Sequence, residues 1–401
     1  SGIKHRLLAA GFISIKTAGS LEFQQPMLYR IRNIGLLVRF VVTVSSLVLS
    51  ACQTSSPGDV MPASSDIDIE SSVEITAREL EPTAESYSNP VVPLIEFPAD
   101  EGSHESAWEW WYFNGHLETE DKREYSYHFV FFEVFIEPLK TYALAGHGSI
   151  TNREEGTYDF AQRLGSRDVS PKGELQIDTD GWVMNGGDGA FILDMTIGES
   201  ALRLELEAVK PAVLHGGNGY VEYSDLGGSY YYSYPRINSN GIVIDNGIER
   251  KVTGLSWMDH QWGDAILSEL GWDWFNLQLN DGTELMYYKL RDGQGKTIHQ
   301  FGTVIDDQGR PREIDPKYLS VEPLGVWESE TSRSIYPSGW RLEMDQDISL
   351  NITPVVEESE FYIPGSFLPV YWEGAVVASA HGLNGAEKGR GFVELVGYIP
   401  P

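Results

Sequence analysis

The 401-residue sequence contains a single cysteine, Cys52, so no intramolecular disulfide framework holds the fold together. Basic residues are also scarce, since 29 Lys and Arg stand against 59 Asp and Glu and give a net charge of −30. An extended nucleic-acid contact needs clustered Lys and Arg, so we expect no nucleic-acid partner. Beyond residue 100 the sequence also lacks the long alanine- or leucine-rich stretches that would favour a helix bundle.

The usual catalytic motifs are missing as well. The sequence has no G-x-S-x-G elbow, no H-E-x-x-H, no P-loop and no G-x-G-x-x-G in a strand–helix–strand context. A three-histidine metal site could form in space, but no ligand spacing supports one. The scattered histidines of the β-rich region are His116, His128, His147, His215, His260 and His381. We therefore predict neither a metal nor a cofactor.

What the sequence does contain favours strands and tight turns. It has 20 Tyr, 16 Phe, 11 Trp and 41 Gly. From about Trp108 onward, short runs of alternating apolar residues are separated by turn signals such as Asn246-Gly247 and Asp281-Gly282. Regular spacing of this kind predicts an all-β sandwich or barrel.

The N-terminal part resembles targeting sequence. Residues 1–52 hold a basic start after Met27 and an apolar run that ends in Leu49-Ser50-Ala51-Cys52, which resembles a bacterial lipobox. The alternatives are an ordinary signal peptide and a short anchor. A lipid on Cys52 would place the protein at the cell envelope, anchored to a membrane outside the cytoplasm; otherwise it would be secreted. Residues 53–104, rich in Ser, Pro, Glu and Asp, are predicted to be a disordered linker.

A faint internal repeat divides the remainder. Trp110–Leu117 can be laid on Trp272–Leu279, with Trp, Phe-Asn and the final Leu in common. In each copy a polar turn and a Tyr-rich strand follow. We predict two similar β-domains, 105–265 and 266–401, with the segment Gly254–Gly263 at their junction, where ligand pockets are common.

The junction segment concentrates polar and aromatic groups. On an extended strand Trp257, Asp259 and Gln261 would share one face, and His260 and Trp262 the other. If the second face looks into a barrel, a ring that titrates near neutrality and an indole enter one cavity. This arrangement suits protonation of an alkene, with ring faces stabilising the cation, and equally suits plain binding of an apolar ligand. The simpler alternative is a core strand whose polar groups are only hydrogen-bonded.

Three motifs in order resemble the lipocalin-like carotenoid 1,2-hydratase family, which includes bacterial predicted secreted hydrolases. The motifs are Glu109–His116, Trp257–Gly263, and the closing pair Tyr371–Gly374 and Gly389–Tyr398. The resemblance implies two tandem lipocalin-like antiparallel β-barrels, after the signal segment and linker, and a hydrophobic, often isoprenoid, ligand.

The resemblance also implies which residues carry catalysis. It assigns them to His260 and Trp262, with Asp259 beside them, and to Tyr287. Hydratases of the family have an acid two residues after that tyrosine, whereas this sequence has Lys289, which argues against carotenoid hydration itself. The candidate ligand-binding residues are Trp110, Tyr112, His116, Trp257, Trp274 and Tyr232.

From these observations we expect a cell-envelope lipoprotein that binds a hydrophobic small molecule. It would hydrate, isomerise or cyclise that molecule by acid–base chemistry. The first alternative is a lipid carrier or scavenger without catalytic activity. The second is a secreted hydrolase, for which the sequence offers no nucleophile.

Overall fold

The computed structural model describes residues 94–398, except 137–140, 168–172, 266, 268–269, 346–347, 365–368 and 381–384. Within these ranges the protein consists of antiparallel strands and a few short 3-10 helices, so the predicted all-β class is confirmed. No helix in the described ranges has the length and apolar character needed to span a membrane. The predicted signal segment, with Cys52, and most of the predicted linker lie outside the described residues.

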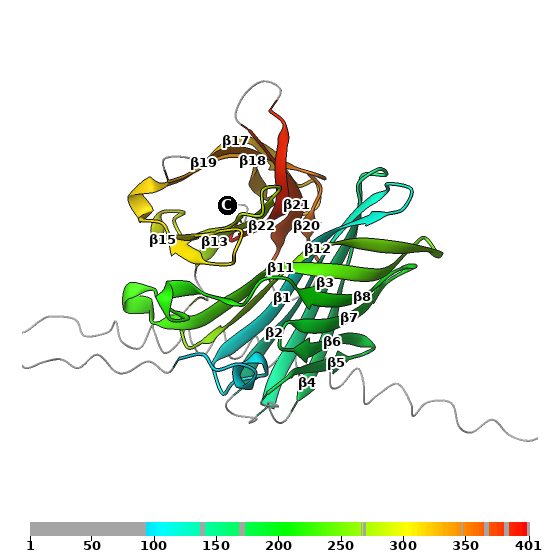
Figure 1. The fold of residues 1–401 in the computed structure, drawn as a ribbon, viewed down its shortest axis with the longest axis horizontal. Coiled ribbons are helices and arrows are strands. Elements are labelled where there is room, and N and C mark those ends of the chain that lie inside the picture. The colour runs from blue at the N-terminus through cyan, green and yellow to red at the C-terminus, as the bar shows by residue number, and fades with distance from the viewer. Residues whose placement is uncertain are drawn as a thin grey trace, which may run out of the picture. The chain divides into compact units, whose positions relative to one another are not determined.

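The first sheet curls into a nearly closed barrel (Figure 1). Its strands are β1 (Trp108–Thr119), β2 (Glu124–Ile136), β3 (Thr141–Asn152), β4 (Thr157–Arg167), β5 (Leu175–Thr179), β6 (Trp182–Gly187), β7 (Ala190–Ile197), β8 (Ser200–Ala208), β9 (Val213–Leu214), β10 (Tyr220–Glu222), β11 (Gly228–Asp245) and β12 (Ile248–Gly263). The order is β4-β3-β2-β1-β12-β11-β8-β7-β6-β5, with β9 and β10 paired to β11. The edge strands β4 and β5 approach each other through side chains, since the Arg167 guanidinium donates to the Gln176 carbonyl at 3.4 Å.

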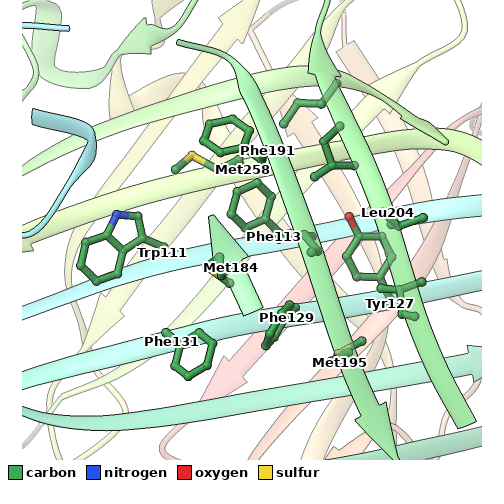
Figure 2. Packing of buried hydrophobic residues seen from close by; sticks show 14 of the residues in the cluster. Trp111, Phe113, Tyr127, Phe129, Phe131, Met184, Phe191, Met195, Leu204 and Met258 are labelled. Atoms are coloured by element: carbon green, nitrogen blue, oxygen red, sulfur yellow. The ribbon is translucent and has the colours of Figure 1, made fainter. Parts of the chain in front are cut away.

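Large apolar side chains fill the inside of this sheet. Alternate residues of each strand point inward, so residues from β1, β2, β6, β7 and β12 meet in one cluster. Figure 2 shows Trp111, Phe113, Phe129, Met184 and Met258 among its members. The first sheet therefore encloses a packed core.

The second sheet is a smaller antiparallel half-barrel that also holds an apolar cluster on its inner face. Its strands are β13 (Gly271–Leu279), β14 (Glu284–Arg291), β15 (Thr297–Ile305), β16 (Pro311–Glu313), β17 (Leu319–Glu328), β18 (Ile335–Met344), β19 (Ile348–Pro354), β20 (Glu360–Phe361), β21 (Tyr371–Ala380) and β22 (Glu387–Val396). The order is β16-β15-β14-β13-β22-β21-β19-β18-β17, with β20 paired to β21. Its inner face holds a separate cluster that includes Phe275, Tyr287 and Trp340.

The internal repeat is visible in the structure. β1 and β13 hold equivalent places, because each pairs with the strand that follows it and with the last long strand of its own sheet, β12 or β22. The equivalent residues Asn114 and Asn276, 162 positions apart, exchange amide hydrogen bonds of 3.5 and 3.3 Å. The outer faces of the two sheets thus meet back to back, and a third apolar cluster includes residues of both.

The sequence predicts a disordered linker as far as residue 104. The structure instead shows ordered chain from residue 94, so this boundary is corrected. In the segment 94–104, here called the strap, Ile95 joins the core of the first sheet and the Phe97 ring lies 4.9 Å from that of Tyr232. The buried carboxylate of Glu101 accepts from the Tyr234 hydroxyl at 2.9 Å and from the Asp188 amide at 2.6 Å. These apolar and polar contacts offset the entropy lost on ordering the segment.

Candidate active site between the two sheets

A cavity of about 70 Å³ lies where the outer faces of the two sheets meet. A water molecule takes about 30 Å³ of liquid volume, so the cavity has room for about two waters. Aromatic side chains from both sheets form most of its wall, among them Trp110, Tyr112, Tyr231, Trp274 and Tyr288. Three carboxyl side chains also reach it: Asp259 of β12, Glu373 of β21 and Glu394 of β22.

Asp259 is buried and accepts three hydrogen bonds, which leaves about one of its four acceptor sites open. One oxygen accepts from the Trp257 indole at 2.6 Å and from the Ser233 hydroxyl, and the other accepts from the Tyr231 hydroxyl at 2.6 Å. Burial raises the pKa of Asp259 to about 6, although the three hydrogen bonds favour the ionised form. Near neutral pH this carboxyl is therefore mostly a carboxylate.

Glu373 and Glu394 lie opposite each other on β21 and β22 and form a close acid pair. Burial raises the pKa of Glu394 to about 7, against a 2.8 Å hydrogen bond from the Trp272 indole. Burial and the neighbouring Glu394 charge raise the pKa of Glu373 well above its usual range, while the Tyr112 hydroxyl donates to it at 2.7 Å. Because two like charges cannot both ionise cheaply here, the pair holds a proton at neutral pH.

Two of these acids hold equivalent places in the repeat. Asp259 lies opposite Tyr112 in the β1–β12 pair, and Glu394 lies opposite Trp274 in the β13–β22 pair. Tyr112 and Trp274 are themselves matched by the 162-residue offset. The back-to-back contact of the sheets therefore brings two equivalent carboxyl groups to one cavity and surrounds them with rings.

The structure brings part of the predicted site together at this cavity. Asp259, Trp110, Tyr112 and Trp274 line it. Trp257 is fully buried behind the wall and orients Asp259 through its indole.

Other predicted residues lie elsewhere between and within the sheets. His116 joins the two sheets by a 3.0 Å contact with the Gly391 carbonyl, and burial lowers its pKa to about 4, so its ring is neutral and donates. Tyr287 points into the core of the second sheet, where its hydroxyl donates to Gln300 at 3.4 Å. Its neighbour Tyr288 faces the cavity instead, and Lys289 pairs with Asp273 at 2.8 Å.

His260 and Trp262 share a face of β12, as expected, with ring centroids 4.6 Å apart. This face looks into the first sheet, where His260 and Trp262 are buried beside Tyr232. The cavity lies on the opposite face, with Asp259 and Gln261. The predicted pair therefore lies inside the first sheet, and the predicted Asp259, on the other face of the same strand, is the one that reaches the cavity.

Sequence reasoning left several cavity residues unassigned, notably Glu373, Glu394 and Tyr231. A signal for the acids was present. When Trp257-Met258-Asp259 is aligned with Phe392-Val393-Glu394, the acids coincide, as do the apolar positions before them. The aligned segments of the repeat noted in the sequence cover only β1 and β13. The matched acids lie on β12 and β22, so they appear only when the alignment is extended to those strands.

Comparison with known proteins decides the family. The AttH-like family model matches residues 90–398, more than three quarters of the chain. The chain belongs to the AttH-like family. A solved AttH-type protein from Nitrosomonas europaea is 29% identical, with a TM-score of 0.71, and the match covers 78% of this chain and 100% of that protein.

Two comparisons of the AttH-like chain involve kievitone hydratases. The structure of the enzyme from Nectria haematococca is 18% identical, with a TM-score of 0.63 over 76% of this chain and 94% of that one, and shows the same fold. The enzyme of Fusarium solani subsp. phaseoli is 20% identical over 200 residues, 48% of this chain. The match spans 56% of that curated relative, about half its length. The family resemblance seen in the sequence motifs is thereby confirmed at the level of the AttH-like family and its fold.

Proposed function

We propose that the protein is a hydratase-type enzyme that adds water to a carbon–carbon double bond, or removes it, in a hydrophobic, isoprenoid-like molecule. The carrying observation is the set of three buried carboxyl groups, with pKa values raised by burial, in an aromatic cavity between the sheets. The likeness to kievitone hydratases supports the same reaction type. Perturbed acids that converge in a cleft are typical of acid–base catalysis.

The chemistry assigns separate roles to the acids. The Glu373–Glu394 pair donates its proton to one alkene carbon, and the electron pair of the double bond forms the new C–H bond. The adjacent carbon becomes a cation, which the faces of Trp110, Trp274 and Tyr288 stabilise. Water adds to this carbon while the Asp259 carboxylate accepts its proton. The substrate gains one water molecule in total. The enzyme returns to its starting state when Asp259 releases its proton to water and the acid pair takes one up.

The carrier alternative accounts for the aromatic wall but not for the acids. A carrier of apolar lipids would gain nothing from three buried carboxyl groups, each of which costs desolvation energy. His260, Trp262 and Tyr287 have no part in this proposal, since they face the cores of the two sheets.

The proposal is tested with labelled water. The protein is incubated in H₂¹⁸O with a lipid extract of its own cell envelope and with a set of isoprenoid alkenes, and products are followed by mass spectrometry. We expect one class of alkene to gain a single labelled water, and the gain to be lost in Glu394→Gln. Isomers without label would indicate proton loss in place of water addition. Molecules recovered unchanged from the parent and variant alike would favour the carrier.

We further propose that a lipid on Cys52 holds the protein at the outer side of a membrane. The support is the sequence Leu49-Ser50-Ala51-Cys52 after an apolar run, together with the acidic charge, which would itself be repelled by anionic lipid. Cys52→Ser should move the protein from the detergent-extracted membrane fraction to the soluble fraction. Membrane association that does not change would contradict the anchor.

A further inference from the structure

A cluster of metal-binding side chains lies on the face of β12 that looks away from the cavity. The carboxylate oxygen Oε1 of Glu109 lies 2.7 Å from Nδ1 of His104 and 2.6 Å from Nε2 of His260. Each of the three residues offers one potential ligand atom, and these three atoms all lie within 4.8 Å of one another. The geometry points to a divalent-cation site made of two imidazoles and one carboxylate, and Zn²⁺ is the ion that it fits.

The far nitrogens of both imidazoles already have the partners that a metal site requires. Nε2 of His104 lies 3.4 Å from the Asp100 carboxylate, and Nδ1 of His260 lies 3.1 Å from the Tyr232 hydroxyl. Metal-bound histidines typically donate their other N–H to a carboxylate, carbonyl or water oxygen, which fixes the tautomer and orients the ring. Bound through Nδ1, a neutral His104 donates from Nε2 to Asp100 and leaves no two acceptors facing each other.

Without an ion the same contacts are harder to satisfy. If neutral His104 donates from Nδ1 to Glu109, its Nε2 lone pair faces the Asp100 carboxylate. The contact is then repulsive unless His104 takes up a second proton. A cation between the three residues removes this conflict and compensates the charge of Glu109, whose side chain is only 1% exposed.

The surroundings favour an ion of low coordination number. The Trp262 ring stacks on His104 at 3.9 Å, and the Trp111 ring lies 4.8 Å from that of His260. These rings leave little room for a six-coordinate shell. Zn²⁺ takes four ligands, with bonds of about 2.0–2.2 Å that place ligand atoms roughly 3.3 Å apart. Oε1 of Glu109 lies closer than this to both nitrogens, so the carboxylate has to withdraw when the ion binds. The His104 side chain is 20% exposed, which leaves access for a water as fourth ligand.

The ion would connect three separate elements. His104 comes from the strap, Glu109 from β1 and His260 from β12. Zn²⁺ would therefore clip the strap to the first sheet, next to Ile95 and Glu101, which hold its preceding part. This site is independent of the proposed hydratase chemistry, because it lies on the other face of β12.

The test uses the full chain without a polyhistidine tag, stripped of metal with a chelator. We expect native mass spectrometry to show uptake of one Zn²⁺ per chain and the melting temperature to rise with added Zn²⁺, because an ion that binds the folded state stabilises it. Co²⁺ in the same site should give the visible absorption of a four-coordinate ion. Glu109→Gln should lose the stoichiometric uptake and the Co²⁺ spectrum.

A milder variant separates binding from folding. Tyr232→Phe keeps the ring but removes the partner of His260, and should weaken Zn²⁺ binding about 10- to 100-fold. The matched control is Tyr125→Phe, which removes a buried tyrosine hydroxyl from the same core, where it donates to Asp245 at 2.9 Å. Equal uptake by the parent and Glu109→Gln would place the ion on the acidic surface and overturn the proposal. A stripped parent that binds no Zn²⁺ would overturn it too.

Discussion

Asp259→Asn should lower turnover in the cavity about 10²- to 10⁴-fold, the usual contribution of a positioned general base. The substitution keeps the volume and part of the hydrogen bonding to Trp257, Ser233 and Tyr231, but an amide cannot accept the proton of the attacking water. Binding of the substrate should change little. The measurement is the rate of labelled-water incorporation at saturating substrate, with Asp178→Asn, an exposed carboxylate of β5, as the control.

The assigned roles also predict how the kcat/KM of the parent protein depends on pH. Asp259 has to be ionised to act as a base, so kcat/KM should rise with pH through about 6. Glu394 has to be protonated to act as an acid, so kcat/KM should fall again above about 7. Because the acids interact, the two pKa values of the profile belong to the acids as a group. Replacing one acid should therefore shift the pKa value that remains.

His260→Gln gives the contrasting result that separates the two faces of β12. If His260→Gln abolished turnover while Asp259→Asn kept it, the chemistry would belong inside the first sheet, where the family resemblance places it. The cavity assignment predicts the reverse, and the two substitutions affect consecutive residues of one strand.

Much of the fold could be predicted because each domain carries local evidence. Aromatic alternation and turn residues identify strands, and the matched segments Trp110–Leu117 and Trp272–Leu279 indicate duplication. The pairing of β1 with β12 and of β13 with β22 could not be read in this way, since it joins residues more than 100 positions apart. That pairing is what makes Asp259 equivalent to Glu394.

The site was harder to predict for a reason of geometry. Alternation along β12 shows that His260 and Trp262 share a face, but does not show which face meets a cavity. In a closed sheet the inner face is expected to hold the ligand, whereas here Trp111, Phe113 and Phe129 fill the inside. The cavity arises only when the outer faces of two sheets meet, and this depends on contacts such as those of Tyr112 with Glu373 and of Trp274 with Tyr231.

The strap shows why average composition can fail to predict local order. Averaged over residues 53–104, a surplus of Ser, Pro, Glu and Asp predicts disorder. Its last eleven residues nevertheless hold Ile95, which joins the core of the first sheet, Phe97, whose ring contacts Tyr232, and Glu101, which accepts a hydrogen bond from Tyr234. Such local anchors disappear in an average over fifty residues.

Glu284→Gln should destabilise the protein by about 3–5 kcal/mol, because it breaks a buried ion network that joins the two sheets. Glu284 on β14 has a fully buried side chain. Its carboxylate accepts a 2.6 Å hydrogen bond from Nζ of Lys210, a residue between β8 and β9. It also accepts from the guanidinium of Arg236 on β11. Burial raises the pKa of Glu284, and the two cations oppose this shift, so the carboxylate is maintained by its partners.

The variant retains the shape of Glu284 but leaves two positive charges without a counter-ion. Lys210 keeps the carbonyls of Gly282 and Asp306, the latter at 2.8 Å, and Arg236 keeps the carbonyl of Leu279 at 2.9 Å. The measurement is denaturant unfolding followed by tryptophan fluorescence, since both sheets contain tryptophan. Glu328→Gln is the matched control: it removes a 2.6 Å ion pair with Arg333 whose side chains are 49% and 68% exposed, and should cost at most about 1 kcal/mol. Equal losses in the two variants would mean that the Glu284 network stabilises the protein no more than an exposed ion pair does. A larger loss in Glu284→Gln, together with weaker ligand binding, would show that the network also holds the walls of the cavity in place.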